Sequence, residues 1–455
     1  MPRYVQSEEK LTLKTKLGFG VGDLGGNLFF TIVGFYLLFY LTEVAGLSAA
    51  LAGTALMIGK IWDAVSDPVV GYISDRTHTR LGRRRPYMLW GSLALLALMV
   101  VVFSIPELPG VWKVLYVILV LCLVNTAWTV VNIPYGALTP ELTKDFHERT
   151  ALNGYRMSFA VVGTFIGAGA VLPLVTAFGG GTRAAAGWTL MALVMGGIML
   201  VSGLITVIVV RERYQQTTSV PENVLSSYFE VLRLKAFRTI LIPWSLHVTG
   251  INIIQATLLY YFAVIFGSEA GFQIALPILL AAAILFIPVW VQISKRIGKK
   301  ISYNIGMGIF GGAVVIFFFL GHRLPIEFAY LLMALGGTGF AAHYVMPFAM
   351  IPDVVEYDVA RNGKRREGVF YGLWTFVAKI GQALGLGLNG LLLTLAGYQE
   401  GATEQSDAAV LVIRLLVGPI PALFFLAGII VLIGYPITQE VYEALLRREE
   451  GDVVE

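Results

Sequence analysis

Twelve long and mainly apolar stretches follow one another along the 455-residue chain, separated by more polar connections. A helix of about 20 apolar residues crosses the hydrocarbon core of a bilayer, so each stretch predicts a membrane-spanning helix. Only 14% of the residues are charged, against about 25% in soluble domains. The first six predicted spans lie near residues 17–42, 49–74, 87–106, 112–138, 152–177 and 187–210. The other six lie near residues 237–266, 272–293, 301–320, 327–351, 368–396 and 411–437.

The distribution of lysine and arginine predicts the orientation of the spans. Basic residues gather in the two termini and in the even-numbered connections, whereas the odd-numbered connections offer only Lys113, Arg183 and Arg323. The positive-inside rule then places both termini in the cytoplasm of a multi-pass protein of the cell (inner) membrane. Basic residues that recur between spans, and not along one face, argue against a nucleic-acid partner. The single cysteine, Cys122, excludes an internal disulfide and a cysteine-built metal site.

The two halves of the chain resemble each other at an offset of about 220 residues. The segment from Pro68 to Ser74 has a counterpart from Pro288 to Ser294, and Pro134 has a counterpart in Pro352. Equivalent spans have the same orientation, which indicates a parallel repeat about an axis along the membrane normal. We therefore predict a six-helix bundle over residues 1–210, a linker over 211–236, a second bundle over 237–440 and a cytoplasmic tail over 441–455.

Two aspartates interrupt the second span. Asp63 and Asp67 are four residues apart, so their carboxylates share one helix face. A charge within hydrocarbon costs at least about 2.5 kcal/mol, and two facing carboxylates favour a shared proton or a bound cation. The pair is a candidate cation site. The alternative is a structural salt bridge, because Lys60 precedes Asp63 by three residues on the same face.

Several motifs carry a resemblance to a known family. Gly71 to Arg76, followed by Gly82 to Arg85, resembles the loop signature of the major facilitator superfamily. In that signature Asp75 can pair across the bundle, and we expect the arginines to contact lipid headgroups. More closely, the chain resembles the glycoside–pentoside–hexuronide cation symporters, whose best-described member is the melibiose permease. The matching motifs are Trp62 to Pro68, Asn132 to Tyr135, Asp353 to Tyr357 and Gly368 to Lys379.

The resemblance covers nearly the whole chain and implies an all-α membrane protein with the major facilitator fold. That fold has twelve transmembrane helices in two pseudo-symmetric six-helix bundles around a central cavity. The implied activity is secondary transport by alternating access. No enzymatic activity is expected, because the sequence shows no nucleophile–base pair or metal cluster near an interface.

The resemblance also implies a set of cation ligands. Asp63 and Asp67 match the carboxylates that bind the coupling cation, and they would be metal ligands if the ion is sodium. Ser66 falls where the family has an asparagine, and Thr129 falls on a threonine ligand. Oxygen ligands suit a small, hard cation, and the serine leaves the choice between sodium and proton open. No cofactor is expected apart from this coupling ion.

For the substrate, the resemblance implies a polar cavity. Arg156 and Lys379 match positively charged positions, Trp128 could stack on a sugar ring, and Asn27 and Asn132 replace two aspartates that hold a galactosyl unit. The full predicted substrate set is Asn27, Trp128, Asn132, Arg156, Lys379, Asp23, Tyr344 and Trp374. The loss of two acids favours an acidic sugar, such as a hexuronide or sulfonated sugar, although Asp23 and Glu356 could neutralise the cavity.

Some alternatives stay open at this stage. The chain could be a cation-coupled lysolipid transporter, because related major facilitator proteins move lysophospholipids, but the polar, ring-sized set of residues favours a small sugar-like substrate. Lys379 could be a structural partner of Glu356 or Asp63. His247 could be a proton relay or a packing residue, and His343 could serve helix packing or ligand contact. Trp90, Trp244 and Trp290 are expected to be interfacial anchors. We expect a monomer within the lipid bilayer.

Overall fold

The computed structural model describes residues 10–143, 146–212, 224–363, 366–402, 404–437 and 441, and these residues form helices and no strand. Among these described residues, eleven helical segments are long and apolar enough to cross a membrane. The twelfth is α3 (Ala49–Arg76), which is 28 residues long but carries Lys60, Asp63 and Asp67 in its middle. The predicted twelve-span fold is therefore confirmed. Residues 213–223 of the predicted linker and 442–455 of the predicted tail lie outside the described residues.

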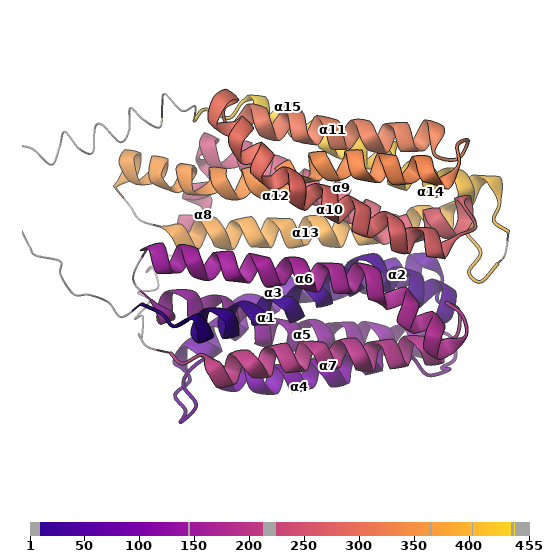
Figure 1. Cartoon of the computed structure of the whole chain (residues 1–455), viewed down its shortest axis with the longest axis horizontal. Helices are drawn as coiled ribbons and strands as arrows, with labels where there is room; N and C mark the ends of the chain where they lie inside the picture. The colour runs from indigo at the N-terminus through magenta and orange to yellow at the C-terminus, as the bar shows by residue number, and fades with distance from the viewer. Residues whose placement is uncertain are drawn as a thin grey trace, which may run out of the picture. The chain divides into compact units, whose positions relative to one another are not determined.

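The chain divides into two compact units. The first comprises Met1–Leu47 and Ile58–Ser219, and its helices run side by side in Figure 1, coloured from indigo to magenta. Its elements are α1 (Leu13–Phe35), α2 (Leu37–Phe39), the π-helix η1 (Tyr40–Val44), α3 from Ile58 onward, α4 (Arg85–Val102), α5 (Val111–Leu142), α6 (Phe146–Gly179) and α7 (Ala185–Val209).

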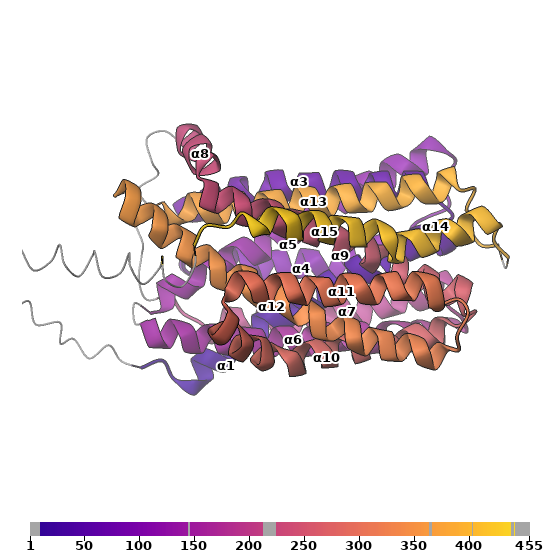
Figure 2. The same ribbon diagram turned by 90° about the horizontal axis from the view of Figure 1, so that it is seen from above.

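The second unit comprises Ser48–Met57 and Val220–Glu455, and Figure 2 shows the helices of the latter stretch from magenta through orange to yellow. The first turns of α3 thus group with this unit. Its other elements are α8 (Val224–Arg233), α9 (Lys235–Ile265), α10 (Glu269–Ile297), α11 (Lys299–Leu320), α12 (Ile326–Asn362), α13 (Glu367–Leu395), α14 (Asp407–Val417) and α15 (Pro419–Ile433).

The same packing pattern occurs in both units. In the first unit α1 packs on α6 and α7, and α4 packs on α5 and α7. In the second unit α9 packs on α13 and α15, and α11 packs on α12 and α15. Helices at equivalent positions in the two halves therefore make equivalent contacts, as expected for pseudo-symmetric bundles.

Small residues allow the closest helix contacts in both units. Gly163 of α6 lies directly against the backbone of Leu24 in α1, where a side chain would collide with the main chain. In the equivalent pair of the second unit, a Cβ atom on Gly385 would lie 3.1 Å from the carbonyl oxygen of Thr249. Helices in lipid associate through such close backbone approach, because lipid tails remove most of the hydrophobic driving force.

The arginine cluster between α3 and α4 is buried and paired. Arg84 is 5% exposed, donates from Nε to Glu141 Oε1 at 3.2 Å, and also pairs with Asp75. Arg83 donates to the same Glu141 oxygen at 2.5 Å. Asp75 pairs with Arg84 of the same α3–α4 connection, nine residues further along the chain, whereas a pairing across the bundle had been expected. The expectation that these two arginines contact lipid headgroups is wrong, because a buried carboxylate of α5 binds both side chains.

Glu212, just beyond the end of α7, caps the start of α4. Its carboxylate accepts hydrogen bonds from the backbone N–H groups of Arg83 and Arg84, both at 2.7 Å. The first N–H groups of a helix have no intrahelical acceptor, and their positive dipole end favours a carboxylate. A Cβ atom at Gly82 would lie 2.7 Å from this carboxylate, and the backbone there has a φ of +103°, so the turn depends on glycine.

The last predicted span is broken into α14 and α15 at Gly418. Proline at position 419 has no N–H and disfavours helical backbone in the residue before it. Gly418 adopts φ −117° and ψ −101°, a conformation that glycine reaches easily. The span therefore crosses as two short helices.

Candidate cation and substrate sites

Four side-chain oxygens from α3 and α5 converge in the first unit. The hydroxyl oxygen of Thr129 lies 3.0 Å from Asp63 Oδ1 and 3.1 Å from Asp67 Oδ1. The hydroxyl oxygen of Ser66 lies 3.3 Å from the hydroxyl oxygen of Thr129. Asp63 and Thr129 have no exposed surface. The i, i+4 spacing on α3 brings both carboxylates to α5, so the structure brings together all four predicted cation-site residues.

The hydrogen count of this cluster favours a bound cation or proton. Thr129 has one hydroxyl hydrogen, but two carboxylate oxygens lie within hydrogen-bonding distance of it. The hydroxyl of Ser66 donates to the backbone carbonyl of Asp63 at 3.1 Å. One carboxylate contact therefore lacks a hydrogen unless a proton is shared or a cation lies between the oxygens. Carboxylate and hydroxyl oxygens suit a small, hard cation.

The local backbone structure of α3 supports a cation site at the same position. Pro68 lies inside α3, directly after Asp67, and cannot donate to the carbonyl of Ala64. That carbonyl therefore loses its usual intrahelical donor in the turn that carries the two aspartates. The described residues contain no group of three histidine, cysteine, aspartate or glutamate side chains that could hold a metal ion. The donor set fits a monovalent cation better than a transition metal.

The alternative salt bridge is present in the same cluster. Lys60 Nζ lies 3.5 Å from Asp63 Oδ2, and the ammonium group also lies 5.3 Å from the ring centre of Phe30. Lys60 is 6% exposed. The salt bridge and the oxygen cluster use different oxygens of Asp63, so they coexist. Counted by themselves and with all three ionised, Lys60 and the two aspartates carry a net charge of about −1.

A second buried ion pair lies between α1 and α6. Arg156 Nε donates to Asp23 Oδ2 at 2.5 Å, and its guanidinium lies 4.9 Å from the ring centre of Tyr135. The Tyr135 hydroxyl donates to the carbonyl of Phe19 at 2.9 Å. The nearby Asn27 side chain donates to the backbone carbonyl of Asp23 at 3.0 Å. The positive charge of Arg156 is thus offset within the first unit.

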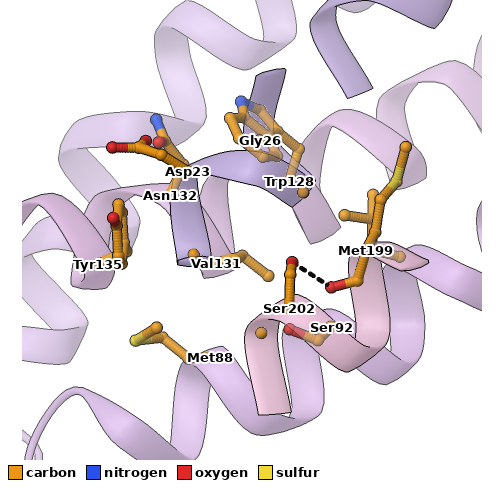
Figure 3. A pocket seen from close by; sticks show the side chains of 14 residues that line it. Asp23, Gly26, Met88, Ser92, Trp128, Val131, Asn132, Tyr135, Met199 and Ser202 are labelled. Carbon is orange, nitrogen blue, oxygen red and sulfur yellow. Dashed lines mark hydrogen bonds between the residues drawn. The ribbon is translucent and has the colours of Figure 1, made fainter. Parts of the chain in front are cut away.

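A small cavity adjoins this ion pair (Figure 3). Asp23, Trp128, Asn132 and Ser202 are among its lining residues, from α1, α5 and α7. Its volume of about 20 Å³ holds about one water molecule and is far below the 300–1,000 Å³ of typical ligand pockets. A sugar ring does not fit in the cavity as it stands.

Trp128 is 4% exposed, and one face of its ring stacks on Phe29 with centroids 5.0 Å apart. A Cβ atom at Gly26 would lie 2.8 Å from Trp128 Cη2, so glycine at this position makes room for the indole. Stacking of Trp128 on a sugar, and the substrate roles of Asn27, Asn132 and Asp23, remain predictions.

The other three predicted substrate residues belong to the second unit. Lys379 and Trp374 lie on α13 and are 8% and 3% exposed, whereas Tyr344 of α12 is 50% exposed. Trp374 stacks on Trp244 of α9 with centroids 4.8 Å apart, and Trp244 stacks on His343 of α12 at 4.9 Å.

The expected interfacial roles of Trp244 and Trp290 are wrong. Both side chains are buried, and Trp290 Nε1 donates to the carbonyl of Thr338 at 2.7 Å. Both tryptophans lie near the end of a predicted span, and this position suggested that they anchor their helices at the membrane interface. Each tryptophan instead faces a neighbouring helix of its own unit, which only the tertiary structure reveals.

Comparison with known proteins defines the class. The family described as MFS/sugar transport protein matches residues 18–439. The chain is 33% identical to the uncharacterized symporter sll1374 of Synechocystis sp., over 96% of each chain. It is 30% identical to the isoprimeverose transporter of Lactiplantibacillus pentosus, over 90% of this chain and 85% of that protein. It is 25% identical to the sodium-dependent lysophosphatidylcholine symporter 1 of Xenopus tropicalis, over 95% and 89%.

Fold, site and relatives together define a multi-pass membrane transporter of the major facilitator superfamily. Within it, the chain belongs to the glycoside–pentoside–hexuronide cation symporter family, as the sequence motifs predicted. This is a transporter family and not a class of enzymes. Its members handle a small-molecule substrate together with a coupling cation.

Proposed function

We propose that the protein couples uptake of a sugar or glycoside to the entry of Na⁺ or H⁺. The observation that carries the proposal is the convergence of Asp63 and Asp67 on the single hydroxyl of Thr129. A cation gradient drives a second solute only where the cation's binding is coupled to the solute's binding. The matching family, described as MFS/sugar transport protein, and the relative named isoprimeverose transporter support the sugar class.

Transport into membrane vesicles tests this proposal. Purified protein is reconstituted, and uptake of glycosides, uronides and pentoses is measured with an imposed sodium gradient, an imposed proton gradient or neither. We expect accumulation of at least one sugar under one of the two gradients. Uptake that never exceeds equilibration under either gradient would contradict coupling, and absence of any sugar uptake would contradict the substrate class.

The charge of the substrate can be probed at Lys379, the second positively charged position of the predicted substrate set. Arg156 pairs with Asp23 at 2.5 Å, so a variant of Arg156 would also break that ion pair. We therefore expect Lys379→Ala to weaken uptake of an acidic sugar far more than uptake of its uncharged analogue. Loss of a buried charged partner costs about 2–5 kcal/mol. Equal loss for both sugars would assign Lys379 a structural role.

Lysolipid transport is the second candidate, because a relative with this substrate in its name spans nearly the whole chain. A competition experiment distinguishes sugar transport from lysolipid transport. Lysophosphatidylcholine below its micellar concentration should leave uptake of the preferred sugar unchanged if the substrate is a sugar. Cation-driven lysolipid uptake without any sugar uptake favours the lipid. We further propose that the protein works as a monomer in the cell (inner) membrane with both termini in the cytoplasm.

A further inference from the structure

Four aromatic rings form a continuous stack in the second unit. Trp374, Trp244 and His343 lie nearly parallel, with interplanar angles of 11° and 12°. Phe340 continues the stack beyond His343 at 5.9 Å. Phe348, which is 51% exposed, makes T-shaped contacts with Trp244 and Trp374, with ring centroids 5.3 and 6.3 Å apart. Helices α9, α12 and α13 all contribute, so the stack depends on the assembled bundle.

A hydrogen-bonded chain fixes the tautomer of His343. His247 Nε2 lies 3.2 Å from the carbonyl oxygen of Phe425, which only accepts, so His247 carries its hydrogen on Nε2. Its Nδ1 then accepts from the Tyr303 hydroxyl at 2.7 Å. Tyr303 has no second hydrogen, so at 3.3 Å its oxygen accepts from His343 Nδ1. Nε2 of His343 is left as a bare acceptor.

The polar edges of the stack lack partners. Among the residues that the structure describes, the buried Nε1–H groups of Trp244 and Trp374 make no hydrogen bond. His343 makes its one described hydrogen bond through Nδ1. A buried polar group without a partner costs about 1–3 kcal/mol, so two such groups on one stack require an explanation.

We propose that the stack of Trp374, Trp244 and His343 is a subsite for a hydroxyl-rich ring, with His343 Nε2 accepting from a ligand hydroxyl. This proposal rests on the proposed sugar function and names where part of the sugar binds. Each sugar hydroxyl both donates and accepts, so neighbouring hydroxyls match one bare nitrogen and two indole donors. His247 and Tyr303 act as positioning residues for His343. Both indole N–H groups are buried in this structure, so a ligand reaches them when the Phe348 side chain moves aside.

Nuclear magnetic resonance of labelled protein tests the subsite directly. The indole N–H signals of Trp244 and Trp374 are assigned with Trp244→Phe and Trp374→Phe, and the protein is titrated with methyl glucoside, methyl xyloside or methyl glucuronide. We expect saturable shifts of both signals with a glycoside that the protein transports, and none with glycerol. A transported glycoside that leaves both signals unmoved overturns the subsite while symport stands. If no glycoside is taken up, both proposals fall.

Variants separate positioning from packing. His343→Phe keeps the stacked ring but removes the acceptor, so we expect glycoside affinity to fall roughly three- to tenfold with unchanged cation dependence. Tyr303→Phe should weaken affinity less, and histidine ¹⁵N spectra should show His343 losing its single tautomer. Tyr261→Phe is the matched control, because its buried hydroxyl donates at 3.2 Å to Phe317, away from the stack. A wild-type His343 with its hydrogen on Nε2 overturns the proposal.

Discussion

Thr129 makes the two aspartates of α3 act as one site. A hydroxyl that faces two carboxylate oxygens at nearly equal distance cannot satisfy both. Both carboxylates therefore depend on the same hydrogen-bond donor. Removing either carboxylate dismantles the shared arrangement, so the two aspartates should be equally necessary for coupling.

We expect Asp63→Asn or Asp67→Asn to abolish concentrative uptake and to leave exchange of substrate across the membrane partly intact. The amide keeps the size of the side chain but not the charge that the driving ion neutralises. Uptake under a cation gradient and exchange without one measure the two activities separately. Normal accumulation in either variant would remove the basis of the cation assignment.

Thr129 supplies a neutral oxygen, so its loss should be milder. We expect Thr129→Ala to weaken the apparent cation affinity by roughly three- to tenfold, about the value of one hydrogen bond or neutral ligand. Thr129→Ser, which keeps the hydroxyl, is the matched control and should stay near the wild type. Cation dependence of the uptake rate provides the measurement. Equal loss in both variants would indicate a packing role for the threonine methyl group.

At the scale of elements, single side chains connect helices that are distant in sequence. Glu212 attaches the end of α7 to the start of α4, and Glu141 of α5 binds the two arginines that precede α4. The α3–α4 connection is therefore held by Glu141 of α5 and by Glu212 beyond α7, in addition to hydrogen bonds among its own residues such as Thr79 with Gly82.

Glu212→Ala should lower the free energy of unfolding of the purified protein by about 1–2 kcal/mol, the usual cost of a lost helix cap. Glu212→Gln should cost less, because the amide oxygen still accepts hydrogen bonds while the charge is lost. Thermal unfolding in detergent gives the order wild type, Gln, Ala. Glu107→Ala is the control, since that side chain is 93% exposed and its pair with Lys113 contributes little. Similar losses at both positions would contradict a capping role.

Local spacing explains which parts of the site could be predicted from sequence. Asp63, Asp67 and Lys60 lie within two turns of one helix, so their common face follows from helix geometry alone. The pairing of Arg84 with Glu141, and the stack of Trp244 on His343, join different helices. Such contacts depend on the register between helices, and the hydropathy of the sequence does not predict that register. The break at Gly418 could have been predicted from the following proline.

At the scale of the whole molecule, the two halves of the chain repeat one pattern of helix–helix packing. The pairs α1–α6 and α9–α13 both rest on close glycine contacts, at Gly163 and Gly385. An even number of spans puts both termini on one side of the membrane. Lysine and arginine bias assigns that side to the cytoplasm, which remains a prediction.

Cysteine labelling checks this orientation. We expect Gly181→Cys, in a Cys122→Ala background, to react with a membrane-impermeant maleimide on intact cells. Gly181 is preferable to Gly180, whose φ of +73° would strain a side chain. Arg80→Cys is the matched control and should react only after the membrane is opened. The reverse pattern would invert the topology.

The salt bridge of Lys60 has a consequence for how the membrane potential acts on the transporter. Counted by themselves, the ammonium of Lys60 and the two carboxylates carry about one negative charge, and one bound monovalent cation balances it. A membrane potential then acts mainly on the return of the empty carrier, at about 2.3 kcal/mol per charge per 100 mV for full crossing. An inside-negative potential should therefore raise the maximal uptake rate more than the apparent affinity. In Lys60→Gln the empty cluster would carry about two charges, and this dependence on voltage should steepen.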